Sequence, residues 1–359
     1  MSTATRASVD LGALRHNLAQ ARRHAGRARV MAAIKADAYG HGLIRTARAL
    51  AAADALAVAR PSEGLALRQA GIGTPILVLD GALDGEELRA CAAAALDVVV
   101  HRAAQLDLLR RLDPARPLGV WLKVDSGMHR LGVAPASAAA LHRELSLLPA
   151  VRGPVGLMTH LAEADAAGAQ ATRRQCDCFA AAAAGCHGPR SLANSAALLR
   201  WPWTHADWVR PGIMLYGISP FARQTGASLG LRAAMRLTGT LIDVRPLAAG
   251  EAVGYGATWH APARTVLGVI ATGYGDGYPR HAPSGTPVWL NGRRVALAGR
   301  VSMDLITVDL GHGASDRPGD TAELWGPRQP VEEVAAAAGT IGYELVCGVT
   351  RRTTVDVEP

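Results

Sequence analysis

Lysine is almost missing from this sequence. The chain of 359 residues holds two lysines, Lys35 and Lys123, beside 36 arginines. Arginine keeps its proton under ordinary conditions, whereas lysine can also act as an amine nucleophile or as a base. Because arginine replaces lysine wherever a fixed positive charge is enough, the two remaining lysines are the first candidates for chemistry.

Long apolar runs and a signal peptide are also missing. No uninterrupted apolar stretch reaches the roughly 18 residues that cross a membrane, and the first residues contain no apolar core of a secretory signal. Five cysteines in so long a chain argue against a disulfide framework and for a reducing compartment. We therefore expect a cytoplasmic protein with no membrane partner.

Positive charge is present but not concentrated. The net charge is +8, yet the arginines are scattered, with no run longer than two and no stripe interleaved with aromatic residues. We expect a solvated surface and no nucleic-acid partner. Cys176, Cys178 and His187 are too few for a zinc site, which needs about four ligands, so we expect no metal and interpret the cysteines as structural.

The first 210 residues alternate short apolar runs with helical patterns, and helix start signals stand at Pro61 and Pro135. Eight strands alternating with helices predict a (β/α)8 barrel of the TIM type. A doubly wound sheet is disfavoured because no GxGxxG follows an early strand. The strands are predicted near residues 30–34, 55–58, 76–79, 97–100, 119–124, 155–159, 191–193 and 206–209.

The pattern changes at about residue 230, where strand-like runs lie close together and one late helix is predicted over 331–338. Asn291-Gly292 between apolar runs is a strong hairpin signal. We predict a barrel domain over 1–230, whose first few residues could pair with the second domain, and a mostly-β domain over 231–359. The strands of the second domain are predicted at 236–244, 265–271, 287–290, 293–298 and 304–309.

Chemically versatile side chains stand at the C-terminal ends of the predicted barrel strands. Barrel enzymes place their sites at this face, so we expect these side chains to converge. They are Lys35 after the first strand, Lys123 and Asp125 at the fifth, His160 at the sixth, Asn194 and Ser195 at the seventh, and Arg210 and Gly212 at the eighth.

Lys35 opens the segment KADAYGHG, residues 35–42. A lysine at the end of a buried strand can lose its proton through desolvation and form a Schiff base with a carbonyl cofactor. The segment lacks the GxxxxGK[ST] pattern, so Lys35 is not a P-loop lysine.

KADAYGHG resembles the cofactor-lysine motif of bacterial alanine racemases, which are barrel-type enzymes that use pyridoxal 5′-phosphate (PLP). Further segments resemble this family in the same order, over nearly the whole chain, although the tail at 351–354 departs from its valine-proline-arginine end. These segments are VWLKVDSGMHRLG (120–132), MTH (158–160), LANS (192–195), VRPGIMLYG (209–217), VGYGATW (253–259), GYGDGYPR (273–280), GRVSMD (299–304) and IGYEL (341–345).

The resemblance implies two catalytic residues in a homodimer that interconverts L- and D-alanine, for peptidoglycan or for alanine catabolism. Lys35 would carry PLP and act as the base on one face of the substrate Cα, and Tyr255 would act on the other face from the second subunit. A phenolate needs cationic neighbours, and the resemblance offers His160 and Arg210 for this network.

The resemblance also implies the cofactor and substrate contacts. Arg210 would face the pyridine nitrogen of PLP and, because it keeps its own proton, would leave that nitrogen unprotonated. Arg130 and Met303 would contact the substrate, and Lys123, often carbamylated in the family, and Asp304 would support the site. The remaining cofactor-binding positions are Tyr39, His160, Asn194, Ser195, Gly212, Ile213 and Tyr343.

Several alternatives stay open at this point. Lys123 could form an ordinary ion pair with Asp125 or another acid. A broad-specificity amino-acid racemase of the same fold would share every motif. A barrel-type decarboxylase is disfavoured by Arg210, and a lone PLP-binding barrel is disfavoured by residues 231–359 and Tyr255.

Overall fold

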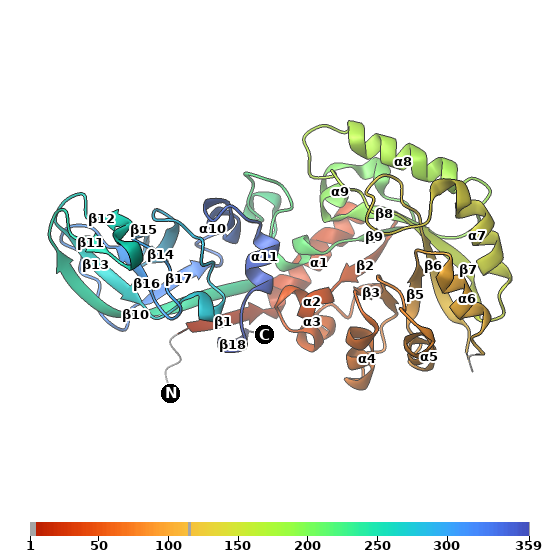
Figure 1. The fold of residues 1–359 in the computed structure, drawn as a ribbon, viewed down its shortest axis with the longest axis horizontal. Helices are drawn as coiled ribbons and strands as arrows, with labels where there is room; N and C mark the ends of the chain where they lie inside the picture. Colours follow the sequence, from red (N-terminus) through yellow and green to blue (C-terminus); the bar gives the residue numbers. More distant parts are fainter. Residues whose placement is uncertain (1–4, 114–115, 359) are drawn as a thin grey trace.

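The computed structural model describes residues 5–113 and 116–358, and in this part of the chain eight parallel strands close into a barrel (Figure 1). The predicted barrel is confirmed, and each strand is hydrogen-bonded to its neighbour in the sequence, with the last paired to the first. The barrel strands are β2 (Arg29–Ala33), β3 (Ala55–Val58), β4 (Ile76–Val78), β5 (Asp97–Val100), β6 (Leu118–Lys123), β7 (Val151–Met158), β8 (Arg190–Asn194) and β9 (Trp208–Arg210).

Helices surround the barrel, and the first of them precedes the first barrel strand. Helix α1 packs against β2, α3 and α9, so it occupies the position between the last and first strands of the ring. The helices are α1 (Leu11–Ala25), α2 (Lys35–Tyr39), α3 (Leu43–Ala49), α4 (Pro61–Gln69), α5 (Gly85–Ala93), α6 (Ala104–Arg110), α7 (Pro135–Leu147), α8 (Gln170–Ala182) and α9 (Ser195–Arg200). Short 3₁₀ turns follow at η1 (Pro202–Thr204), η2 (Ile213–Tyr216) and η3 (Ala227–Leu229).

The interior of the barrel is filled with side chains. Met31, Leu77, Val99, Trp121 and Met158 form a buried cluster of their own, separate from the larger core that the helices cover. Trp121 needs a glycine opposite it, because a Cβ at Gly156 would lie 2.5 Å from its ring. The packed interior leaves only the ends of the strands for chemistry.

The C-terminal half is a mostly antiparallel sheet, as predicted (Figure 1). Its strand order is β13-β16-β15-β14-β17-β10-β1-β18, and β11 and β12 form a separate small hairpin. The strands are β1 (Thr5–Asp10), β10 (Met235–Leu247), β11 (Ala252–Val253), β12 (Trp259–His260), β13 (Thr265–Ile270), β14 (Pro287–Leu290), β15 (Arg293–Leu297), β16 (Ile306–Asp309), β17 (Thr321–Trp325) and β18 (Thr354–Glu358).

The two ends of the chain meet in this sheet. β1 pairs with β10 in antiparallel fashion and with β18 in parallel fashion, so it lies between them. The helices α10 (Val331–Ala337) and α11 (Gly342–Cys347) lie between the sheet and the barrel in Figure 1. The 3₁₀ turns η4 (Tyr255–Ala257) and η5 (Tyr274–Asp276) complete this half.

Some sequence predictions of this half are wrong. A single late helix was expected over 331–338, but α11 follows α10 after a break at Gly339, whose φ is +69°. β17 and β18 were not expected.

In the barrel, β7 begins four residues before the predicted 155. The prediction missed its exposed first half because that half includes Gly153 and Pro154, two residues that rarely mark a strand.

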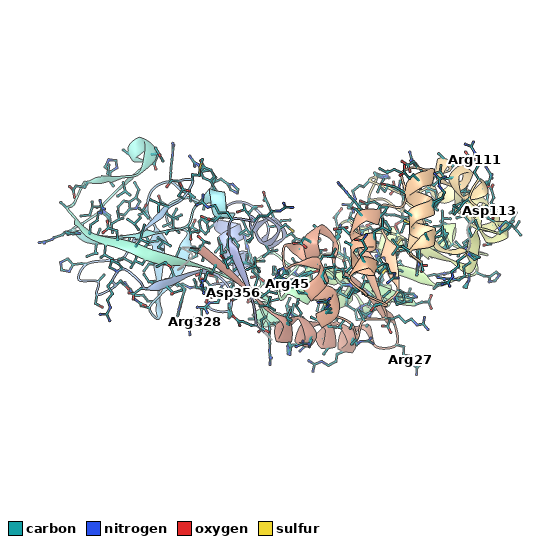
Figure 2. All side chains as sticks on the ribbon, turned by 90° about the horizontal axis from the view of Figure 1, so that it is seen from below. Arg27, Arg45, Arg111, Asp113, Arg328 and Asp356 are labelled. Carbon is teal, nitrogen blue, oxygen red and sulfur yellow. The ribbon has the colours of Figure 1, made fainter. Side chains whose placement is uncertain are left out.

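No helix in residues 5–113 and 116–358 combines the length and the apolar composition that crossing a membrane requires. Charged side chains occur along the whole molecule: Arg27 and Arg111 belong to the barrel half, and Arg328 belongs to the sheet half (Figure 2).

Candidate active site

A cavity of about 630 Å³ lies at the mouth of the barrel, where the C-terminal ends of the strands meet. All but three of the predicted site residues line it. They are Lys35, Tyr39, Lys123, Arg130, His160, Asn194, Ser195, Arg210, Gly212, Ile213 and Tyr343. The expected convergence of strand ends is therefore observed, except that Asp125 does not line the cavity.

Lys35 enters this cavity from an unusual turn. After Lys35 at the end of β2, the φ angles of Ala36, Asp37, Ala38 and Tyr39 lie between +50° and +54°, so four successive residues without a glycine adopt the left-handed conformation. This conformation costs roughly 1–2 kcal/mol per L-residue. Both Lys35 and Tyr39 line the cavity as a result of this turn.

Arg210 is buried and held by neutral oxygens. Its NH1 donates to Ser191 Oγ (2.6 Å), and its NH2 donates to the carbonyls of Thr159 (2.5 Å) and Leu192 (3.3 Å). Burial lowers the pKa of Arg210 to about 10, so it remains a cation at pH 7. Among the described residues, no carboxylate pairs with Arg210, and no group of any kind accepts a hydrogen bond from its Nε. This donor is therefore available to a bound molecule in the cavity.

His160 is neutral, in contrast to Arg210. Burial, followed by the charges of Arg210, Lys123, Arg130 and Lys35, lowers its pKa well below the ordinary value. Of the two residues suggested by the sequence as cationic neighbours of a phenolate, only Arg210 is therefore charged. These four cations outnumber the two carboxylates that line the cavity, Asp80 and Asp165, so the cavity is electropositive, which favours an anionic ligand.

Lys123, at the end of β6, has no carboxylate within ion-pair distance in the described part of the chain. Burial is the main reason why its pKa falls from 10.5 to about 8, and Arg210 and Arg130 lower it further. The carboxylate of Asp125 instead accepts the amides of Gly127 and His129 (3.1 and 2.9 Å). The alternative ion pair between Lys123 and Asp125 is thus wrong.

One side of the cavity is a cluster of hydroxyls and amides. Ser195 Oγ accepts the amide of Gly212 (2.8 Å), and a Cβ at Gly212 would lie 2.4 Å from the Tyr39 hydroxyl, so only glycine allows this approach. The amide of Ile213 begins η2, where a helix has no internal acceptor for it. Burial raises the pKa of Tyr39 and of Tyr343, so both keep their hydroxyl protons.

Asn194 serves a different purpose from the hydroxyls. Its Oδ1 accepts the amide of Ala197 (3.0 Å) as the N-cap of α9, and its Nδ2 donates to the carbonyl of Leu161 (3.3 Å). It therefore shapes the cavity wall by joining two strand ends.

Tyr255, Met303 and Asp304 do not line this cavity. Tyr255 lies in η4, which connects β11 and β12. These two strands lie at the end of the sheet remote from the barrel (Figure 1). The side chains of Tyr255 and Met303 are 70% and 53% exposed. Asp304 forms an ion pair with Arg352 (2.7 Å), so the divergent tail contacts the Met303 loop.

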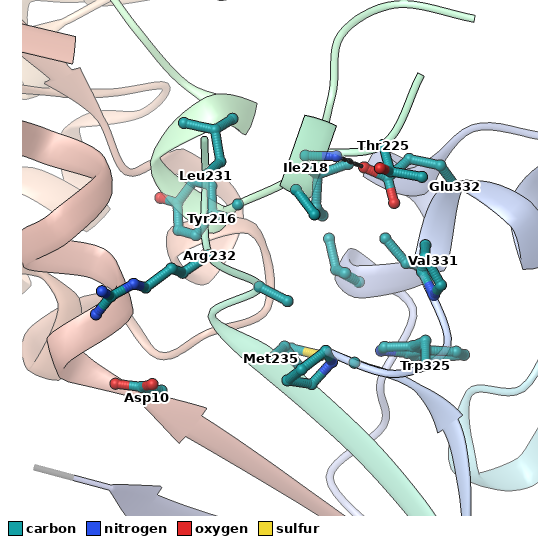
Figure 3. Close-up of a pocket in the computed structure, with 18 residues that line it drawn as sticks. Asp10, Tyr216, Ile218, Thr225, Leu231, Arg232, Met235, Trp325, Val331 and Glu332 are labelled. Carbon is teal, nitrogen blue, oxygen red and sulfur yellow. Dashed lines mark hydrogen bonds between the residues drawn. The ribbon is translucent and has the colours of Figure 1, made fainter. Parts of the chain in front are cut away.

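A second cavity, of about 290 Å³, lies between the barrel and the sheet (Figure 3). Met235, Trp325 and Val331 make much of its lining apolar, and Glu332 Oε1 accepts the amides of Ser219 (2.8 Å) and Gly226 (2.7 Å) beside it. None of the predicted site residues is among the described residues that line it. Its position and lining mark it as a packing cavity at the junction of the two halves.

Comparison with known proteins agrees with this arrangement. The family model for the N-terminal domain of alanine racemase matches residues 9–220, and the model for the C-terminal domain matches residues 234–357. This chain belongs to the alanine racemase family. An alanine racemase of Yersinia pestis is 51% identical over 356 residues, which are 99% of each chain, and one of Nitrosococcus oceani is 53% identical over 349 residues, 96% of this chain and 97% of that one.

Solved structures of alanine racemases have the same fold. The structure of the biosynthetic alanine racemase from Pseudomonas aeruginosa superposes with a TM-score of 0.96 at 45% identity, and the alignment covers 100% of both chains. The alanine racemase from Streptomyces coelicolor A3(2) gives a TM-score of 0.92 at 38% identity over 99% of this chain and 98% of that one.

Some residues around this alanine racemase site escaped the sequence analysis. Asp80, Asp165 and Cys347 line the cavity, and Glu63 contacts the turn that follows Lys35. Asp80 and Asp165 lie in loops after β4 and β7. Their position after a strand end was the available signal, but they belong to none of the quoted motifs.

Proposed function

We propose that this chain racemises alanine with PLP bound in the cavity at the barrel mouth. The observation that carries the proposal is that Lys35 lines the same electropositive cavity as a buried Arg210, with which no carboxylate of the described residues pairs. The full-length similarity to proteins named alanine racemase supports the choice of alanine as substrate.

The donor set of the cavity fits this cofactor. Lys35 offers an amine for the aldehyde carbon, and Tyr39, Ser195 and the amides of Gly212 and Ile213 offer donors for the phosphate. Tyr343 and the surplus of positive charge around His160 suit the same anion. When bound, the cofactor withdraws electrons from the substrate Cα and makes its C–H bond acidic.

Arg210 would set the type of reaction. Its guanidinium keeps its proton and would leave the ring nitrogen of the cofactor without one. The weaker electron withdrawal that follows favours return of a proton to Cα over transamination or decarboxylation. Arg210 is therefore the residue of this chain that would direct the site toward racemisation.

Two bases are needed because the proton must leave one face of Cα and return to the other. Lys35 Nζ would move the proton on one face. Tyr255 lies outside the cavity of its own chain, so the partner subunit's Tyr255 would serve the other face in a homodimer. Arg130 would bind the substrate carboxylate with its fork of donors, and the Met303 backbone would contact the substrate from the partner side.

The position of Lys123 beside Arg130 suggests a supporting role. A carbamate on Lys123 would place a negative charge where Arg130 and Arg210 now concentrate positive charge, and it would orient Arg130. The ion pair of Asp304 with Arg352 would hold the Met303 loop in place. We also infer that the protein works in the cytoplasm, in line with its five cysteines, which are all free in the described residues.

Substitution of Lys35 tests this function. We expect purified wild-type protein to show the near-visible absorbance of bound PLP and to racemise alanine, and Lys35→Ala to lose both. Arg111→Ala, which removes an exposed cation remote from the cavity, is the control and should retain both. Retention of full racemase activity by Lys35→Ala would refute the proposal, and a panel of amino acids in the same assay measures the substrate range.

A further inference from the structure

The left-handed turn after Lys35 is fastened at both ends by side chains to which no role in the reaction has been given so far. At its start, Glu63 Oε1 accepts the amide of Ala36 (2.7 Å). At its end, His41 Nδ1 contacts the carbonyls of Ala38 (3.1 Å) and Tyr39 (2.8 Å). Glu63 thus accepts an amide of the turn, and His41 contacts two of its carbonyls, of which that of Ala38 also accepts the amide of His41 (3.0 Å).

Glu63 ties the turn to the neighbouring barrel strand. Its second oxygen, Oε2, accepts the amides of Ala59 (2.8 Å) and Arg60 (3.1 Å), which follow β3 at the start of α4. No arginine pairs with this carboxylate in the described ranges, so its hydrogen bonds all go to backbone amides. One carboxylate thus holds the ends of β2 and β3 at a fixed separation.

His41 acts on the carbonyl end and is oriented by its surroundings. Carbonyl oxygens only accept, so Nδ1 must carry the proton and donate it. The ring is fully buried, packs against Tyr216 with 4.6 Å between centroids, and its Nε2 has no partner among the described residues. Tyr216 also stacks on Tyr39 at 4.6 Å and donates its hydroxyl proton to the carbonyl of Ala33 (3.0 Å).

The left-handed conformation is unfavourable for each of its four L-residues, so the turn needs external contacts to persist. Its benefit is geometric, because Lys35 and Tyr39, four residues apart, both face the cavity. We propose that Glu63 and His41 are positioning residues, which hold this turn and thereby fix the Lys35 amine and the Tyr39 hydroxyl at the barrel mouth. In naming Lys35 as the cofactor lysine, this inference rests on the function proposed above.

Amide hydrogen exchange of the full-length protein, followed by mass spectrometry, tests the inference without relying on activity. In Glu63→Gln, the amide group of glutamine would face an amide donor, so we expect the amides of residues 36–43 to exchange at least about tenfold faster. Glu87→Gln is the matched control, because Glu87 accepts the amide of Leu83 (2.8 Å) at the start of α5 and does not contact the turn. It should leave residues 36–43 unchanged.

His41 provides an independent pair of variants. His41→Phe keeps a ring against Tyr216 but loses the donor, whereas His41→Asn keeps an N–H donor near the position of Nδ1. We expect His41→Phe to reproduce the faster exchange and His41→Asn to stay within about twofold of wild type. If Glu63→Gln does not fold, this pair decides the question alone.

Cofactor binding and kinetics give a second readout. We expect Glu63→Gln and His41→Phe to release PLP at least about tenfold faster and to lose kcat, while KM for alanine changes by less than about threefold because Arg130 is untouched. Wild-type exchange rates in both variants, or faster exchange spread evenly over the barrel, would overturn the inference. Failure of the wild type to bind PLP would instead overturn the proposed function. The two failures can be distinguished, because hydrogen exchange can be measured whether or not PLP is bound.

Discussion

Lys123 shows how a single residue changes character when the fold surrounds it. In the sequence it is one of two lysines, and its possible partners include Asp125. In the structure the carboxylate of Asp125 accepts backbone amides instead. Besides burial, three cations, Arg210, Arg130 and Lys35, lower the pKa of Lys123, and the carboxylate of Asp80 opposes them. Its pKa of about 8 makes the neutral amine abundant at mildly alkaline pH.

Carbamylation of Lys123 should therefore depend on pH. The neutral amine attacks CO₂, forms a C–N bond and releases one proton, so the product should accumulate above pH 8 and decline as the amine becomes protonated below it. Carbon NMR with ¹³C-labelled bicarbonate should show a carbamate signal at pH 8.5 that is lost by pH 6.5. Lys123→Arg should lack it, and a wild-type spectrum without the signal at pH 8.5 would leave Lys123 an ordinary amine.

Tyr255 and Lys35 should differ in the enantiomer that they deprotonate. As the family resemblance implies, we expect Lys35 to take the proton of D-alanine and Tyr255 that of L-alanine. In deuterated water, Tyr255→Phe should still exchange the α-hydrogen of D-alanine, while exchange from L-alanine should fall by about 10²–10⁴-fold. Equal loss from both enantiomers would contradict the assignment of faces. Tyr274→Phe provides a comparison, because it removes a tyrosine hydroxyl from another 3₁₀ turn of the same half, η5.

At the scale of elements, hydrophobic pattern predicts where strands lie and does not predict how loops bend. The barrel strands β3 and β5 and the sheet strand β14 have the predicted bounds, because each is a short apolar run between turn signals. The left-handed turn after Lys35 carries no such signal, since its sequence lacks glycine. Contacts with Glu63, distant in the sequence, accompany that conformation, and local pattern cannot reveal them.

The hairpin at Asn291-Gly292 was predictable for the opposite reason, because its residues carry the conformation themselves. Leu290 pairs with Arg293, and the two turn residues have φ of +44° and +84°. The same principle explains part of the site, because the residue types of Gly212 and Lys35 alone indicate their roles in the sequence. The separation of Tyr255 from the cavity of its own chain is not, because it depends on how two domains are arranged.

Gly292→Ala should destabilise the protein by about 1–2 kcal/mol, since alanine is strained at positive φ. Open space surrounds the position, so a clash contributes nothing. Gly168→Ala is the matched control: Gly168 also has nothing within 4 Å, and its φ is not positive. Urea unfolding should show the loss for Gly292→Ala only, and equal midpoints for the two variants would contradict the role of φ.

At the scale of the molecule, the barrel and the sheet lie side by side, and β11 and β12 lie at the end of the sheet away from the barrel (Figure 1). Tyr255 belongs to η4, which connects these two strands. A site that needs both Lys35 and Tyr255 cannot be complete within one chain of this shape. Two copies, each offering its sheet to the cavity of the other, would make two complete sites.

Mixed dimers test this arrangement. Lys35→Ala and Tyr255→Phe should each be nearly inactive alone, whereas dissociation, mixing in equal amounts and reassociation should restore about one quarter of wild-type activity. Half of the dimers would then be mixed, and each would hold one intact site of two. As the control, two separate preparations of Lys35→Ala are dissociated, mixed with each other and reassociated in the same way. Activity in the mixture no greater than in the separate variants would contradict a shared site.

The position of β1 has a consequence for how the protein is made. β1 leaves the ribosome first and β18 last, yet they are adjacent strands, with Arg6 opposite Thr354. This edge of the sheet therefore stays incomplete until translation ends, although the whole barrel has already emerged. A chain that stalls near residue 340 would expose the unpaired hydrogen-bonding edge of β1. Such an edge can pair with another chain and lead to aggregation, and β18 prevents this by covering it.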